Sequence, residues 1–146
     1  MRRAFDVNVA APLVLSQLVH AGMLQGGRGC SVNVGSIAGD VGIGRFPQAS
    51  YAASKGGLHP LTRELAAQWS RHGIRVDTLA PGLFRNEMTA PLFDHPKTEQ
   101  WIADRETLRR HIEVTDLAAA LLFLVSDDSA SMTGPTLLID NRWTAR

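Results

Sequence analysis

The sequence predicts an α/β fold in which helices cover both faces of a parallel β-sheet. Three short segments, at residues 30–36, 74–80 and 136–140, have strand-like composition and are bounded by turn residues. Segments with helical periodicity separate them, and this alternation of strand and helix is typical of βαβ units. Because a βαβ crossover joins parallel strands, we expect one parallel sheet.

The first half of the chain contains one predicted helix on each side of the first strand. Apolar side chains recur at helical spacing from Phe5 through Leu24, and a Gly-Gly pair ends this helix. After the strand and a glycine-rich loop at residues 39–47, a long helical pattern extends from about residue 49 to residue 71. Gly73 follows and ends the second helix.

The second half begins with the strand at residues 74–80, which Pro81-Gly82 stops. Residues 83–112 are less regular and contain two prolines, so we expect short helices or lid-like loops there. Thr115 is the predicted N-cap of a helix that continues through Leu124, ahead of the third strand. The sequence has no repeats and no inter-domain linker, which indicates a single domain.

The composition is that of an ordinary soluble globular protein, with 45% hydrophobic and 20% charged residues. A formal net charge of +1 gives no electrostatic reason to expect a nucleic acid or an acidic membrane surface as partner. The single cysteine, Cys30, excludes an internal disulfide framework and fits a reducing compartment. The five histidines lack metal-ligand spacing, so no metal site is expected.

The N-terminus superficially resembles a secretory signal, because two arginines precede an apolar stretch. Asp6 and Asn8 interrupt this stretch, and Gln17 and His20 follow at helical spacing, which favours an ordinary helix. We expect no segment long enough for a transmembrane helix. A cytoplasmic location is therefore predicted.

Tyr51 and Lys55 are four residues apart on the second predicted helix, so their side chains project from one face. A free tyrosine has a pKa of about 10 and is a poor acid or base at neutral pH. A lysine ammonium nearby favours the phenolate and makes such a pair a usable general acid/base. By itself, however, this short spacing is better explained by a tyrosine at a helix start and a solvent-facing lysine.

Two neighbouring strand ends strengthen the functional interpretation. Ser36 follows the first strand and Pro81-Gly82 follows the second, at the carboxyl ends where open parallel sheets place their ligand sites. A serine hydroxyl there can hydrogen-bond a substrate oxygen and share its proton with Tyr51. Taken alone, Ser36 is equally a turn or helix-capping residue.

The chain resembles the classical short-chain dehydrogenase/reductase family in the order of its motif residues, which are Asn8, Ser36, Tyr51, Lys55 and Pro81-Gly82. The resemblance extends over essentially the whole chain. It implies a Rossmann-like, doubly wound parallel sheet. It also implies one catalytic domain over residues 1–146, with a substrate lid at about residues 83–112.

The resemblance implies a role for each motif residue. Tyr51 would be the general acid/base, Ser36 would orient the substrate oxygen, and Lys55 would hold the ribose of a nicotinamide cofactor. Asn8 would hold a water molecule of a proton relay. Cofactor contacts are implied for Tyr51, Lys55, Pro81, Gly82, Phe84 and Asn86.

Pro12 gives the Asn8 role a separate physical basis. It lies four residues after Asn8 and has no N–H, so the Asn8 carbonyl loses its helical partner and is free to bind a water. A simple kink of the helix at Pro12 explains the same residues equally well.

The chain departs from the family pattern at three places. Asn86 stands where a threonine commonly bonds the cofactor carboxamide, and its amide can both donate and accept. The loop between Ser36 and Tyr51 is slightly longer than usual. Asp140-Asn141-Arg142 stands where Asp-Gly-Gly is common.

The sequence lacks the glycine-rich turn, between a first strand and a first helix, that lets a cofactor pyrophosphate approach backbone amides. The nearest match, at residues 39–44, is a decoy because Arg45-Phe46-Pro47 separates it from the next helix. We therefore expect a fold without the N-terminal nucleotide-binding half. The strand near Val34 would form an exposed sheet edge, leaving the isolated chain unstable, poorly soluble or dependent on a partner.

The first hypothesis is an oxidoreductase that uses NAD or NADP to interconvert a ketone and a secondary alcohol, as a homodimer or homotetramer. A 3-oxoacyl-thioester (acyl carrier protein) reductase fits the same motifs. The alternative from another class is a truncated, non-catalytic fragment that acts only through association, and the absent glycine-rich turn favours it. The motifs select neither the substrate nor the cofactor.

Overall fold

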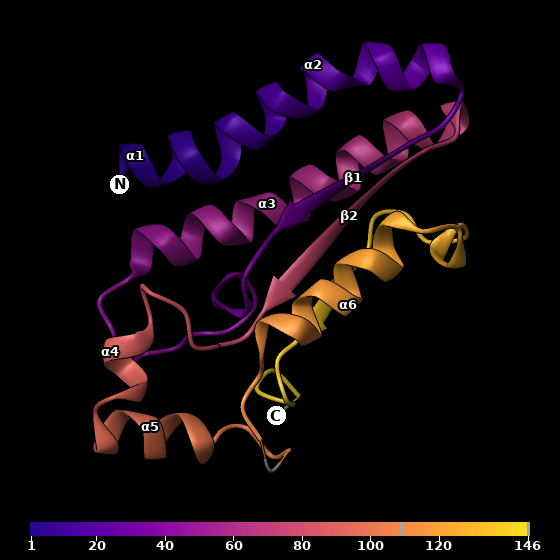
Figure 1. Cartoon of the computed structure of the whole chain (residues 1–146). Coiled ribbons are helices and arrows are strands. Elements are labelled where there is room, and N and C mark those ends of the chain that lie inside the picture. Colours follow the sequence, from indigo (N-terminus) through magenta and orange to yellow (C-terminus); the bar gives the residue numbers. More distant parts are fainter. Residues whose placement is uncertain (109, 146) are drawn as a thin grey trace.

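A three-stranded parallel sheet organises the computed structural model, which describes residues 1–108 and 110–145 (Figure 1). The strands β1 (Gly29–Val34), β2 (Ile74–Pro81) and β3 (Thr136–Ile139) lie in the order β1-β2-β3. Both pairings are parallel, with Gly29 opposite Ile74 and Thr78 opposite Thr136. The predicted α/β class and parallel sheet are confirmed.

Helices cover both faces of this sheet. α2 (Ala11–Gly26) and α3 (Ala49–Trp69) lie on one side of β1 and β2, and α6 (Val114–Val125) lies on the other side (Figure 1). α1 (Arg2–Phe5) continues into α2 through a π-helical turn at Asp6–Ala10. Among the described residues no strand pairs with the outer side of β1, so β1 is an edge strand, as expected from the sequence.

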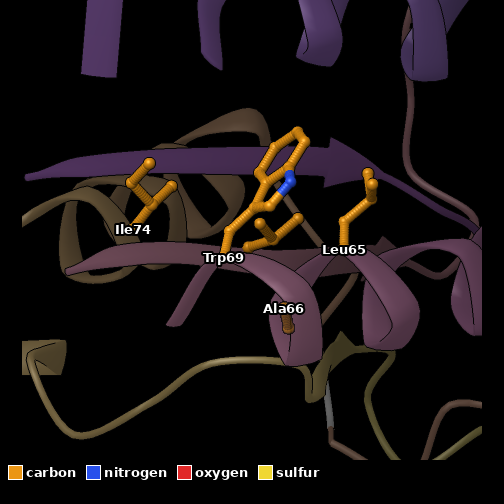
Figure 2. Close-up of a cluster of buried hydrophobic side chains, with 5 residues drawn as sticks. Leu65, Ala66, Trp69 and Ile74 are labelled. Atoms are coloured by element: carbon orange, nitrogen blue, oxygen red, sulfur yellow. The ribbon is translucent and has the colours of Figure 1, made fainter. Parts of the chain in front are cut away.

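The main core lies between α3 and β2. Leu65, Ala66 and Trp69 of α3 pack on Ile74 and Val76 of β2, and all five side chains are 7% exposed or less (Figure 2). Leu65 and Trp69 are four residues apart, which places both on the helix face that meets the sheet. Partly buried side chains of α2 pack against the same cluster, so this layer ties α2 to the sheet as well.

A buried polar triad fixes α3 above the two longer strands. Asn33 of β1 donates through Nδ2 to Thr62 Oγ1 of α3 at 2.9 Å, and Thr78 of β2 donates to the same oxygen at 2.8 Å. All three residues are buried, so these bonds satisfy groups that would otherwise be desolvated without a partner. The triad therefore sets the position of α3, which carries Tyr51 and Lys55, relative to the strand ends.

Two sequence-based expectations are wrong. The N-cap of α6 is Glu113, not Thr115, because the carboxylates of Glu113 and Asp116 form a capping box in which each accepts the other's backbone N–H. The continuous helical run Arg2–Gly26 has 25 residues and contains an 18-residue stretch with a mean hydropathy of 1.5, so by length and composition alone it could cross a membrane. The expectation that no segment is long enough for a transmembrane helix is therefore wrong as to length.

Asp116 makes the start of α6 sensitive to pH. Arg110 donates to both of its carboxylate oxygens, at 2.7 and 2.8 Å, and with the N–H of Glu113 this lowers the pKa of Asp116 to about 2. We expect Asp116→Asn to destabilise the fold at neutral pH, because these charge-assisted bonds are lost. An unfolded aspartate has a pKa of about 3.9, so the stabilisation is present above that pH and lost as the pH falls toward 2.

Thermal unfolding of both proteins between neutral and strongly acidic pH measures this difference. Asp128→Asn is the control, because the Asp128 carboxylate makes no hydrogen bond or ion pair with another described residue. A difference between the Asp116 proteins that stays constant down to the lowest pH would show that the carboxylate charge is not its source.

The turn Asp140-Asn141-Arg142, which stands where Asp-Gly-Gly is common, contains backbone strain. Asn141 and Arg142 have φ values of 47° and 74°, in the left-handed region that glycine adopts without a penalty. The Asp140 carboxylate accepts hydrogen bonds from the N–H of Arg142 and from both the N–H and the hydroxyl of Thr144. These bonds hold the strained turn in place of the glycines.

Replacing Arg142 with glycine is expected to stabilise the protein by about 0.5–1 kcal/mol. Relief of the left-handed backbone gains about 1–2 kcal/mol, and the greater freedom of glycine in the unfolded chain offsets about half of it. Urea unfolding measures the change. Gly134→Ala is the control and should lower the free energy of unfolding. Gly134 has a φ of 92°, so a side chain at this position should destabilise the protein.

Candidate active site

A cavity of about 870 Å³ opens at the carboxyl ends of β1 and β2. It is lined by every site residue that the sequence predicts, namely Asn8, Ser36, Tyr51, Lys55, Pro81, Gly82, Phe84 and Asn86. These residues come from the first helical run, the end of β1, α3 and the end of β2. The fold thus brings together side chains that are far apart in the sequence.

Ser36 lies directly after β1 and begins a 3-10 turn at Ile37–Gly39. Its Oγ accepts the backbone N–H of Ala38 at 3.2 Å, so the capping role is present in the structure. The hydroxyl proton is left to donate to a ligand, because Oγ acts only as an acceptor in this bond. Gly35 lets the backbone just before Ser36 pass close to the Thr78 side chain of β2, since a Cβ at residue 35 would lie 2.8 Å from Thr78 Cγ2.

Tyr51 and Lys55 occupy the first two turns of α3. The Lys55 Nζ lies 5.9 Å from the centroid of the Tyr51 ring and donates to the carbonyl of Val34 at 2.6 Å. Burial lowers the pKa of Lys55 from its ordinary value of 10.5. Tyr51 is 37% exposed, so its phenol is accessible to a molecule in the cavity.

Asn8 lies in the π-helical turn, where the N–H of Ala11 reaches back to the carbonyl of Asp6. Pro12, which cannot donate, is thus accommodated by a local widening of the helix. The Asn8 amide Nδ2 donates to Ser54 Oγ at 3.0 Å, and Ser54 Oγ donates to the Tyr51 carbonyl at 2.7 Å. This chain of bonds ties the first helical run to the turn of α3 that carries Tyr51.

Asn86 organises the turn after β2. Its Oδ1 accepts the N–H groups of Met88 and Thr89, at 2.9 and 3.0 Å, and Thr89 donates its hydroxyl to the carbonyl of Phe84 at 2.6 Å. The Asn86 side chain therefore stabilises this turn through its Oδ1, and its Nδ2 is available to donate to a ligand. Gly82 is required by packing, since a Cβ there would lie 2.9 Å from Ile112 Cδ1.

The segment after β2 folds back over the end of the sheet. It contains α4 (Ala90–Phe93) and α5 (Pro96–Ala103), and Phe84 forms a parallel bridge with Ile112 at its base. A second core cluster, here called the lid cluster, holds it in place and consists of Ile37, Phe93, Ile102 and Trp143. The segment is therefore packed against the turn that begins at Ser36.

His111, near the end of this segment, contacts two glutamates from its middle. Its Nδ1 and Nε2 lie 2.7 Å from Glu106 and 3.1 Å from Glu99. Burial disfavours the charged imidazole, but these hydrogen bonds outweigh it and raise the pKa of His111. Burial also raises the pKa of Glu106. These contacts fasten α5 to the base of the segment.

The glycine-rich loop at residues 39–44 does not form a phosphate cradle. The Cα of Gly39 packs against the backbone of Lys55 and Gly56, where a Cβ would lie 2.8 Å from Lys55 C. α3 starts only at Ala49, so its amide-lined end does not adjoin the glycines. Phe46 instead packs edge-on against Trp101 of α5 at 5.9 Å.

The donors in the cavity fit one end of a nicotinamide cofactor. Lys55 donates to one carbonyl and its ammonium has two further N–H groups, which suits a ribose diol. The Asn86 Nδ2 suits a carboxamide oxygen. Residues 1–108 and 110–145 contain no glycine-rich turn that leads directly from a strand into a helix start, so they do not fit the pyrophosphate.

The sequence interpretation missed other residues at the site, Ser54, Phe46 and Gln48 among them. Ser54 is fully buried between Asn8 and Tyr51, and its position beside Lys55 in the helix was the available signal. Phe46 and Gln48 also line the cavity. They lie in a loop without a recognisable pattern, so only the folded structure reveals them.

Comparisons with known proteins match nearly the whole chain. A family model described as enoyl-(acyl carrier protein) reductase matches residues 1–144. The chain is 40% identical over 146 residues to a galactitol 2-dehydrogenase (L-tagatose-forming) from Cereibacter sphaeroides. That alignment covers 98% of this chain and 56% of the relative.

Solved structures show the same fold. A gluconate 5-dehydrogenase from Burkholderia cenocepacia J2315, in complex with NADP and tartrate, matches with a TM-score of 0.90 and 33% identity, covering 96% of this chain and 54% of that one. A 4-hydroxyisoleucine dehydrogenase complexed with NADH gives a TM-score of 0.92 and 31% identity, covering 97% and 58%. The chain thus spans about half the length of the relatives it matches.

Proposed function

Because the chain belongs to the short-chain dehydrogenase/reductase family, we propose that it supplies the proton-transfer half of an NAD(P)-dependent oxidoreductase acting on secondary alcohols and ketones. The observation that carries the proposal is the convergence of Asn8, Ser36, Tyr51 and Lys55 on one cavity. Relatives complexed with NADP and with NADH support a nicotinamide cofactor of either kind.

Tyr51 acts in this proposal as the general acid/base, taking the proton of an alcohol during oxidation and returning it during reduction. The Ser36 hydroxyl hydrogen-bonds the reacting oxygen and keeps it beside the phenol. The Lys55 ammonium lies close enough to the Tyr51 ring to stabilise negative charge on the phenolic oxygen. When bound, NAD or NADP supplies the hydride acceptor or donor.

Asn8 positions this machinery. Its bond to Ser54 holds the first helical run against the turn that carries Tyr51. We further assign a relay water to the backbone of Asn8, in the widened turn where Pro12 provides no N–H. Residues 83–112 serve in this proposal as the substrate lid, whose base is the bridge between Phe84 and Ile112.

The test joins this chain to the front half of the galactitol 2-dehydrogenase from Cereibacter, since the relatives are about twice as long. The fused protein should bind NADH or NADPH in calorimetry and oxidise a secondary alcohol with formation of the reduced cofactor. Cofactor binding without oxidation of any secondary alcohol in a broad panel would count against the proposed activity.

A non-catalytic protein that acts through association is a second candidate. The outer side of β1, which pairs with no strand in the described part of the chain, and the exposed apolar side chains of Leu15, Leu18 and Leu122 favour it. Calorimetry and sedimentation of the chain itself, with and without NADH, separate the two candidates. Self-association with no cofactor binding by the chain or by the fused protein would favour the second.

A further inference from the structure

The walls of the cavity carry information about the substrate that the motif residues do not. Ile43 and Phe46 come from the loop after Ser36, and Leu83, Met88 and Leu92 come from the segment after β2. Ile43, Leu83 and Leu92 also pack against the lid cluster. These apolar walls are therefore held in place by the core.

The cavity offers almost no charge to a substrate. Lys55 is the one charged side chain among its described lining residues, and it already donates to a backbone carbonyl. Two arginines in the flanking loops are engaged elsewhere. Arg45 lies 5.6 Å from the centroid of the Trp101 ring, and Arg85 donates to Asp94 at 2.7 Å. The carboxylate of a sugar acid would thus be desolvated without a dedicated counter-ion, which is strongly unfavourable.

Most polar side chains of the cavity are already committed to the protein. The Asn8 amide donates to Ser54. The Asn86 oxygen accepts two backbone N–H groups, and the Thr89 hydroxyl donates to a backbone carbonyl. These bonds build the site itself and leave little hydrogen-bonding capacity for a substrate.

Gln48 is the remaining polar side chain. In the proposed function, Ser36 and Tyr51 bind the reacting oxygen, and the free N–H groups of Lys55 and Asn86 bind the cofactor. Gln48 is the N-cap residue of α3 and lines the cavity, and its side chain makes no hydrogen bond with another described residue. A polyol would bring several hydroxyl groups to a site with one free partner, and each unpaired hydroxyl weakens binding by about tenfold.

We propose that the substrate of this site is a small apolar secondary alcohol or its ketone, aliphatic or alicyclic, with at most one further polar group placed at Gln48. This inference rests on the proposed function. In the oxidation, the C–H bond breaks as a hydride passes to NAD(P)⁺ and the O–H proton passes to Tyr51. The C=O bond forms, and the products are the ketone and NAD(P)H.

Binding to the chain itself tests the inference directly. Saturation-transfer NMR titrations with cyclopentanol, 2-hexanol, galactitol and gluconate compare the two classes of probe. We expect each apolar alcohol to bind with a Kd at least about tenfold below that of galactitol or gluconate. Phe46→Ala should weaken the binding of cyclopentanol several-fold. Phe5→Ala, a matched change outside the cavity, should leave it unchanged.

A second cavity variant keeps the test valid if Phe46→Ala fails to fold. Met88 is 88% exposed, so Met88→Ala should keep the fold and still weaken the apolar probes. Tighter binding of galactitol or gluconate, binding of no probe, or identical effects of Phe46→Ala and Phe5→Ala would each overturn the inference.

The fused protein separates this inference from the proposed function. Oxidation of galactitol in preference to cyclopentanol would uphold the activity and overturn the substrate class. Selective binding of apolar alcohols without oxidation of any of them would overturn the proposed activity and leave the ligand preference standing.

Discussion

Replacing Tyr51 with phenylalanine is expected to lower the turnover of the fused protein by about 10²–10⁴-fold, the usual contribution of a positioned general acid/base. Phenylalanine keeps the ring and removes only the hydroxyl that exchanges the proton. Because Tyr51 is 37% exposed and its hydroxyl bonds no other described residue, the fold should be unaffected. Steady-state kinetics with the preferred alcohol measures the loss.

Cofactor affinity provides the internal control for this variant. The Kd for NADH should change by no more than a few-fold, because the Lys55 donors remain in place. Ser36→Ala tests the neighbouring hydroxyl and should lower turnover in the same way, since a separate donor to the reacting oxygen is lost. Near-normal turnover of Tyr51→Phe would reject Tyr51 as the acid/base.

Truncating Trp69 to alanine is expected to destabilise the chain by about 3–5 kcal/mol, the range for large aromatic side chains in a core. Trp69 is 7% exposed, packs between α3 and β2, and stacks on His20 of α2 with ring centroids 4.4 Å apart. Its removal leaves a cavity where two helices meet the sheet. Urea unfolding followed by circular dichroism measures the change.

A loss of this size is a large fraction of the whole stability of a small domain, which is about 5–15 kcal/mol. Trp69→Phe keeps part of the ring contact and should cost distinctly less than alanine. Leu18→Ala, at a position 71% exposed, is the matched control and should stay within about 0.5 kcal/mol of the parent. Equal effects of the Trp69 and Leu18 changes would show that this cluster is not the main core.

The strand–helix alternation was enough to predict the class and the order of elements. Hydrophobic periodicity identifies α3, and Pro81-Gly82 marks the end of β2, because both signals are local. The start of α6 could not be placed as well. Thr115 has the hydroxyl of a usual N-cap, but the carboxylates of Glu113 and Asp116 each accept the other's backbone N–H and start the helix earlier.

Within the candidate site, only the motif residues could be predicted from the sequence. Ser36, Tyr51 and Lys55 belong to a recognised order of residues, so their approach in space could be expected before the structure. Ser54 and Gln48 carry no pattern of their own, because their roles arise from contacts between segments that are distant in sequence. The shape of the cavity likewise depends on how the lid cluster packs.

Ser36, Tyr51 and Lys55 all lie within the one continuous unit β1–α3–β2, at residues 29–81. The buried triad of Asn33, Thr62 and Thr78 bonds its three elements to one another. Such a unit opens only with the most cooperative part of the molecule. In the proposed function, the groups that exchange the proton would therefore keep a constant spacing while substrate enters and leaves.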